Sequence, residues 1–300
     1  MTTNLTSEIA RIKADRGAVI LAHNYQLPEV QDVADFTGDS LELSRKAAAT
    51  DAKVILFCGV HFMAETAKIL SPDKTVLIPD PKAGCPMAEM ITADELREFK
   101  AMHPGVPVVA YVNTTAEVKA ESTICCTSAN AIRVVESIDS DTVLFVPDKS
   151  LGTYVASKVD KTVIPYSGFC PTHHRILAQD VINAKREHPQ ALVVAHPECT
   201  LDVLELADGI ESTSGMLRYV RESAATEFIM CTERGLLHRL KLDNPDKTFY
   251  NPSPLNICPN MKKITLEKVL WSLEDMKHKI ELDADTIAKA KAAIEGMIAI

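Results

Sequence analysis

The sequence lacks the features of membrane and secreted proteins. Its longest apolar runs, such as 54–60 and 106–112, are far too short to cross a bilayer. Residues 1–17 are polar and charged, so they lack the apolar core of a signal peptide. We therefore expect a cytoplasmic protein without membrane contact, in a compartment that keeps thiols reduced.

An excess of positive charge is also missing, and aromatic side chains are scarce. The 300 residues carry a net charge of −9, and aromatic residues make up 5%. A nucleic-acid enzyme needs a basic face, so no nucleic-acid partner is expected. Apolar residues at 46% and charged residues at 24% are nevertheless typical of a folded globular protein. Small anionic substrates remain compatible with this charge, because local geometry binds them.

What the sequence does contain is an alternation of short apolar segments and amphipathic stretches. Nine segments have the length and composition of buried strands: Val19–Ala22, Lys53–Phe57, Thr75–Ile78, Val108–Ala110, Thr142–Val146, Thr162–Pro165, Ala191–Ala195, Glu227–Met230 and Thr248–Tyr250. Strands that alternate with helices predict parallel sheets in an α/β protein. The C-terminal stretch differs, because Leu266–His278 and Ala284–Ile300 are predicted to be helices without a strand.

A set of landmarks recurs three times along the chain. Three predicted strands end at residues 88 and 85 positions apart, namely His23, Tyr111 and His196. Seventeen residues after each comes a hydroxyl residue that we expect to begin a helix as its N-cap: Ser40, Ser128 and Thr213. Each repeat then ends on a Cys-Pro pair, at Cys85, Cys170 and Cys258.

This register predicts three homologous three-layer αβα units with parallel sheets, arranged around a pseudo-threefold axis. We place the units at residues 1–88, 89–174 and 175–261 and expect the C-terminal helices, 262–300, to pack on the first unit. Ligands of such sheets bind at the carboxyl ends of the strands. The repeated residues are therefore expected to converge on one central site.

The three repeated cysteines are candidates for metal ligands. One thiolate from each unit would leave one iron of a four-iron cluster open to substrate, as a Lewis acid. Zinc is the rival metal, but the three ligands include no closely spaced Cys-x-x-Cys pair. The other five cysteines lie in or beside apolar segments and are interpreted as packing residues: Cys58, Cys125, Cys126, Cys199 and Cys231.

Polar residues suited to acid–base chemistry follow the repeated strand ends. The third position of each loop carries Tyr25, Asn113 or Glu198, beside His23 and His196. The helices that begin at Ser40, Ser128 and Thr213 would direct partial positive charge toward the axis, which suits an anionic ligand. His173 and Lys262 follow predicted cysteine ligands closely, and His173 is counted among the substrate-binding candidates.

These residues give the chain a resemblance to the quinolinate synthase family. The resemblance rests on segments spread over nearly the whole chain, including Leu21-Ala22-His23-Asn24-Tyr25-Gln26, Gly59-Val60-His61-Phe62-Met63-Ala64-Glu65, Tyr111-Val112-Asn113-Thr114-Thr115, Cys170-Pro171-Thr172-His173, His196-Pro197-Glu198-Cys199 and Asn260-Met261-Lys262-Lys263. It implies a [4Fe-4S] cluster held by Cys85, Cys170 and Cys258.

The resemblance also implies a reaction and roles for individual residues. The family condenses iminoaspartate with dihydroxyacetone phosphate to give quinolinate, phosphate and two waters, in NAD biosynthesis. An aspartate-oxidising enzyme that supplies iminoaspartate is the implied partner. The family's substrate-binding positions fall on His23, Ser40, Tyr111, Asn113, Ser128, His196, Glu198 and Thr213. Tyr25 matches the family's catalytic tyrosine, and Glu198, His23 and His196 complete the catalytic candidates.

Two other functional classes remain alternatives at this stage. An aconitase-like hydro-lyase would share the open iron but would act on a single hydroxy acid. A metal-binding or redox-sensing protein would carry a structural cluster, with four protein ligands and apolar surroundings.

Overall fold

The computed structural model describes residues 2–300 and contains three four-stranded parallel sheets. The first sheet has the order β2-β1-β3-β4 and is formed by β1 (Ala18–His23), β2 (Phe36–Gly38), β3 (Val54–Cys58) and β4 (Thr75–Leu77). The second has the order β6-β5-β7-β8 and is formed by β5 (Val108–Tyr111), β6 (Ile124–Cys126), β7 (Thr142–Val146) and β8 (Thr162–Pro165). The third has the order β10-β9-β11-β12 and is formed by β9 (Leu192–Ala195), β10 (Gly209–Ile210), β11 (Glu227–Cys231) and β12 (Thr248–Tyr250).

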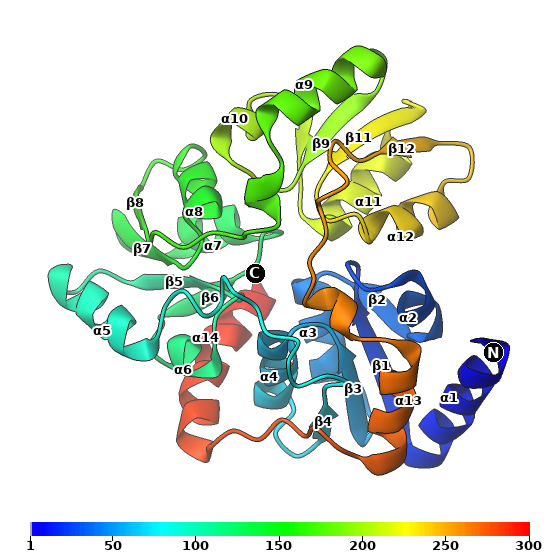
Figure 1. The fold of residues 1–300 in the computed structure, drawn as a ribbon. Coiled ribbons are helices and arrows are strands. Elements are labelled where there is room, and N and C mark those ends of the chain that lie inside the picture. Colours follow the sequence, from blue (N-terminus) through cyan, green and yellow to red (C-terminus); the bar gives the residue numbers. More distant parts are fainter. Residues whose placement is uncertain (1) are drawn as a thin grey trace.

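Identical strand orders confirm the predicted α/β fold of three related units (Figure 1). Each sheet is extended by a strand of two or three residues that the sequence did not predict: β2, β6 and β10. The central strands are almost wholly apolar, and all five residues of β3 are buried. Burial on both faces is what a parallel sheet between two helix layers requires.

Helices cover the sheets of all three units. The first unit carries α1 (Thr2–Arg16), α2 (Pro28–Val33), α3 (Ser40–Ala49) and α4 (His61–Leu70). The second carries α5 (Ala93–Met102), α6 (Ala116–Ala120), α7 (Ala131–Ser137) and α8 (Lys149–Ala156). The third carries α9 (Ala178–Glu187), α10 (Leu201–Leu204), α11 (Thr213–Glu222) and α12 (Leu236–Asp243). Short 3₁₀ turns follow two of the Cys-Pro pairs, at His173–Arg175 and Met261–Lys263.

The two C-terminal helices lie on different surfaces. The helix α13 (Leu266–Asp275) packs against α1 and β3 of the first unit. The helix α14 (Ala284–Ala299) lies between α4 of the first unit and α6 and β6 of the second (Figure 1). It therefore ties two units together, whereas we had expected the whole C-terminal stretch to pack on the first. The unit boundaries at 88/89 and 174/175 stay a prediction.

The first two units share a continuous apolar core with part of the third. A smaller separate core, which includes Val181, Val193 and Val203, lies beneath α9 and α10 of the third unit. Across residues 2–300, none of the helices combines the length and apolar character that a bilayer-spanning segment requires.

Candidate active site

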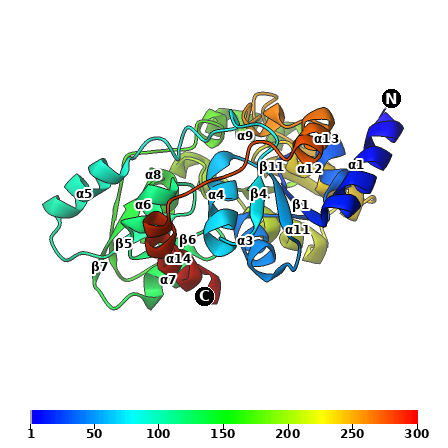
Figure 2. The same cartoon turned by 90° about the horizontal axis from the view of Figure 1, so that it is seen from below.

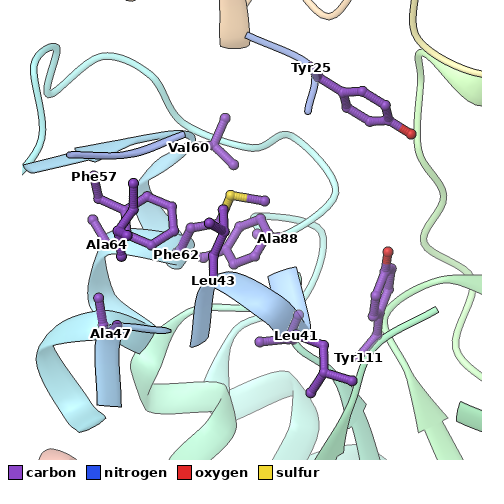
Figure 3. Close-up of a cluster of buried hydrophobic side chains, with 14 of the residues drawn as sticks. Tyr25, Leu41, Leu43, Ala47, Phe57, Val60, Phe62, Ala64, Ala88 and Tyr111 are labelled. Carbon is purple, nitrogen blue, oxygen red and sulfur yellow. The ribbon is translucent and has the colours of Figure 1, made fainter. Parts of the chain in front are cut away.

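The three sheets direct the carboxyl ends of their strands toward a central cavity of about 170 Å³. Every candidate site residue from the sequence lines this cavity: His23, Tyr25, Ser40, Cys85, Tyr111, Asn113, Ser128, Cys170, His173, His196, Glu198, Thr213 and Cys258. Figure 3 shows the Tyr25 and Tyr111 side chains projecting from different units into the same space. The repeat register thus brings together residues that lie up to 235 positions apart in the chain.

The three cysteines of the Cys-Pro pairs are held by equivalent backbone contacts. The backbone carbonyl two residues before each cysteine accepts a hydrogen bond. The donor is the backbone N–H three residues after the end of β3, β7 or β11, the third strand of each unit in chain order. The three bonds run from His61 N to Ala83 O at 2.8 Å, from Lys149 N to Gly168 O at 2.7 Å and from Arg234 N to Asn256 O at 2.9 Å. The repeat therefore fixes the loop that carries each thiol in the same way.

Those three cysteines differ from the other five in exposure. Cys85, Cys170 and Cys258 are free thiols, half-buried at the cavity. The remaining five are free and buried, as predicted for packing residues. Burial raises the pKa of Cys85 to about 12 and also raises the pKa values of Cys170 and Cys258. These thiols are protonated at neutral pH on their own, and a metal would have to displace the protons.

The donor set fits an iron–sulfur cluster with three protein ligands. Each unit contributes one soft sulfur donor, and no fourth cysteine of residues 2–300 lines the cavity. A mixed group also exists, because ligand atoms of Cys170, His173 and Glu198 lie within 4.8 Å of one another. That group would suit zinc, yet its imidazole already contacts the Glu198 carboxylate, with His173 Nδ1 2.7 Å from Oε2. Only the cysteine set uses all three units.

Glu198 is the centre of a buried hydrogen-bond network. The Tyr111 hydroxyl donates to its Oε1 at 2.5 Å, and Asn113 Nδ2 lies 3.5 Å from the same oxygen. His173 contacts Oε2 on the other side. Burial opposes ionisation of Glu198, but the nearby His173 and His196 and these hydrogen bonds outweigh it and hold its pKa below the ordinary value. Glu198 is therefore a carboxylate at neutral pH.

His23 and His196 occupy equivalent positions and have equivalent backbone partners. His23 Nδ1 accepts a hydrogen bond from Tyr25 N at 3.2 Å, and His196 Nδ1 accepts one from Glu198 N at 3.3 Å. Burial lowers the pKa of each imidazole to about 3, despite the nearby Glu198 carboxylate. Both rings are therefore neutral at pH 7, and with Nδ1 occupied as an acceptor the proton lies on Nε2.

Tyr25 belongs to a chain of hydroxyl and imidazole groups. Its hydroxyl lies 2.6 Å from Thr232 Oγ1 and 3.4 Å from His173 Nε2, and Thr232 Oγ1 lies 3.0 Å from the same nitrogen. Burial and the nearby Glu198 raise the pKa of Tyr25 well above its ordinary value, so the phenol keeps its proton. His173 thereby connects Tyr25 to Glu198 through its two ring nitrogens.

The expectation that Ser40, Ser128 and Thr213 act as N-caps is wrong. Ser40 and Thr213 do begin α3 and α11, as predicted, but Asp39 and Ser212 cap these helices, each one residue earlier than expected. Ser128 lies in the turn before α7, which begins only at Ala131. Because Asp39 and Ser212 cap α3 and α11, the hydroxyls of Ser40 and Thr213 are not needed for capping. All three hydroxyl residues line the cavity.

Sequence reasoning missed a buried ion pair beside Cys258. Glu233 is fully buried; its Oε1 accepts a hydrogen bond from Cys258 N at 3.1 Å, and its Oε2 accepts one from Lys262 Nζ at 3.1 Å. Lys262 also donates to the carbonyl of Tyr25. The pair thus joins the loop of a candidate cluster ligand to the loop of Tyr25. The signal was available, because Glu233 lies two residues after the end of β11, where the equivalent position of the second unit is the buried Asp148.

Comparison with known proteins shows the family of the chain. The family model described as Quinolinate synthetase A protein matches residues 7–299. The quinolinate synthase of Dehalococcoides mccartyi is 57% identical over 299 residues, covering 99% of both chains. Quinolinate synthase 1 of Methanosarcina acetivorans is 54% identical over 297 residues, covering 99% of this chain and 98% of that protein. The quinolinate synthase of Thermodesulfovibrio yellowstonii is 53% identical over 299 residues, covering 99% of both. The chain therefore belongs to the quinolinate synthetase A family.

Proposed function

We propose that this protein is a quinolinate synthase of NAD biosynthesis, which condenses iminoaspartate with dihydroxyacetone phosphate to give quinolinate, phosphate and two waters. The observation that carries the proposal is the meeting of three free cysteines, one from each unit, with His23, His196 and Glu198 in one cavity. Family membership over the whole length supports the same activity. We further propose that the enzyme is cytoplasmic and takes its iminoaspartate from an aspartate-oxidising enzyme.

Cys85, Cys170 and Cys258 would hold a 4Fe–4S cluster. When bound, the cluster supplies a Lewis-acidic iron that polarises a substrate oxygen. A structural or redox-sensing cluster would favour apolar surroundings. Apolar side chains such as Val60, Phe62 and Met63 also line this cavity, but it presents imidazole, phenol, hydroxyl and carboxylate groups to a ligand as well, which favours catalysis.

The cavity residues then bind two anions and move protons. His23 and His196 would donate from Nε2 to carboxylate or phosphate oxygens as neutral rings. The hydroxyls of Ser40, Ser128 and Thr213 would donate to further anionic oxygens. Asn113 Oδ1 is buried and has no hydrogen-bond partner in the described chain, so it can accept from a substrate hydroxyl.

Glu198 and Tyr25 are the proposed proton-transfer residues, with opposite roles. Glu198 is ionised and can accept a proton at Oε2, whereas Tyr25 keeps its phenolic proton and can donate it from Oη. His173 and Thr232 lie between them, so a proton can return along this chain after each transfer. Groups of opposite protonation state suit a reaction that both removes protons and expels water.

Anaerobic purification with iron and sulfide counting tests the proposal. We expect about four of each per chain, and quinolinate should form when iminoaspartate and dihydroxyacetone phosphate are supplied. Replacement of Cys85, Cys170 or Cys258 by Ser should abolish the visible absorbance, whereas the buried Cys58→Ser serves as the matched control. Zinc in place of iron would overturn the cluster. Dehydration of a single hydroxy acid without use of the triose phosphate would favour a hydro-lyase instead.

A further inference from the structure

A second cavity adjoins the central one. It has a volume of about 320 Å³, and Asp39 and Ser128 line both cavities. Its walls come from the beginnings of α3 and α11 and from α7 with the turn before it. These three helices lie on one face of the molecule (Figure 2). None of the three candidate cluster cysteines lines it. A ligand in this cavity would therefore be next to the central site but outside it.

Each unit contributes one arginine to the second cavity. Arg45, Arg133 and Arg218 all line it, and each follows the hydroxyl residue of its unit by five positions, so the three occupy one repeat position. All three side chains are exposed. Arg45 donates to the carbonyl of Ile298 at 3.0 Å, and Arg218 lies 3.8 Å from a Glu211 oxygen. The Arg133 guanidinium has no hydrogen bond or ion pair with any residue in the range 2–300.

Three carboxylates line the same cavity, and each has a partner in the protein. Asp39 accepts from the backbone N–H groups of Leu41 and Glu42 at 3.0 Å each and from Ser212 Oγ at 3.2 Å. Glu42 accepts from Ser214 Oγ at 2.5 Å and from Asp39 N at 3.3 Å, and Glu211 lies 3.8 Å from Arg218. The formal charges of the lining therefore balance. Arg133 is the exposed cation among them whose guanidinium pairs with no residue in the range 2–300, so it can pair with an anionic ligand.

We propose that this cavity is the entrance through which dianionic substrates reach the central site, and that the three arginines attract them. The inference rests on the proposed function, whose two substrates are a dicarboxylate and a phosphate monoester. Guanidinium groups pair well with both, and exposed, unpaired cations such as Arg133 at the mouth of a site raise the rate of encounter in a way that salt weakens. Because the arginines lie outside the reacting centre, they should act on kcat/KM and leave kcat at saturation largely unaffected.

Steady-state kinetics at two ionic strengths test the entrance. Arg133→Gln should lower kcat/KM for dihydroxyacetone phosphate about twofold to fourfold at low salt, and much less at about 0.3 M salt. Arg45→Gln/Arg133→Gln/Arg218→Gln should show a larger loss with the same salt dependence. Arg186→Gln on α9 removes an exposed charge that lines neither cavity and is the control. Equal kinetics for Arg133→Gln and Arg186→Gln would overturn the proposal.

Binding separates this inference from the proposed reaction. Calorimetry of dihydroxyacetone phosphate at low salt should show weaker binding to Arg133→Gln than to the unmodified protein or Arg186→Gln. If the protein binds the phosphate ester in this manner but makes no quinolinate, the entrance stands and the proposed reaction fails. If quinolinate forms at a rate that neither salt nor the arginine variants change, the reaction stands and the entrance fails.

Discussion

The neutral state of His23 and His196 predicts a specific loss of stability in acid. An unfolded chain binds a proton on each imidazole below about pH 6.5, whereas burial lowers the pKa of each folded ring to about 3. Between these two pKa values, protons therefore bind the unfolded state in preference to the folded state and favour unfolding. The contribution of these rings to stability is complete above pH 6.5, falls steadily as the pH drops, and levels off below about pH 3. At pH 5.5 the two pKa values imply a cost of about 1.4 kcal/mol per ring.

The prediction is tested with a variant that cannot titrate. Asn at both positions keeps an acceptor near Nδ1 for the backbone N–H groups of Tyr25 and Glu198, so His23→Asn/His196→Asn removes the titration with little change of shape. Urea unfolding of cluster-free protein should show that the unmodified chain loses about 3 kcal/mol more than the variant between pH 7.5 and 5.5. The other titrating groups are the same in both proteins, so their effects cancel in the difference between the unmodified chain and the variant. Equal pH dependence in the two proteins would refute the reasoning, as would an NMR titration of either ring near pH 6.5.

Two further predictions concern contacts within the site. Lys262→Met leaves Glu233 buried without its cation, so we expect a loss of about 3–5 kcal/mol in unfolding free energy; Glu233→Gln/Lys262→Met should recover part of it, and a thermal stability equal to that of the unmodified protein would show that the pair is dispensable. Tyr111→Phe removes the 2.5 Å hydrogen bond to Glu198 and leaves a buried carboxylate with one donor fewer, so we expect a loss of about 1.5–3 kcal/mol in unfolding free energy. An unfolding free energy equal to that of the unmodified protein would show that this hydrogen bond does not stabilise the buried carboxylate.

The site could be predicted because it follows from the repeat. Residues at one repeat position lie at equivalent places in the three units and therefore meet around the axis. This conclusion needs no knowledge of side-chain contacts. The same argument selected Cys85, Cys170 and Cys258 from eight cysteines. It did not find Thr232, because its hydroxyl contacts Tyr25 and His173 of the other two units. It also did not find the pairing of Glu233 with Lys262, because a repeat position indicates where a side chain lies and not which partner it meets.

The missed elements have local causes. The strands β2, β6 and β10 contain two or three residues each, too few for a pattern of buried residues to emerge. Helix α1 is mostly polar, although Ile9 and Ile12 are buried. Helix α14 was predicted, but its apolar positions, such as Ala293 and Met297, could have packed on either unit. In each case the structure depends on tertiary contacts that the local sequence does not specify.

The three matching hydrogen bonds behind the Cys-Pro loops have a consequence for stoichiometry. The same loop occurs once in each unit, so a residue kept in all three copies, as the cysteine is, is presented to the axis three times. A cubane of four irons has one corner more than such a scaffold can bind. In the proposed enzyme, three copies of one loop would bind three of the four irons. The fourth iron would therefore be open to substrate because the scaffold offers no fourth copy of the loop.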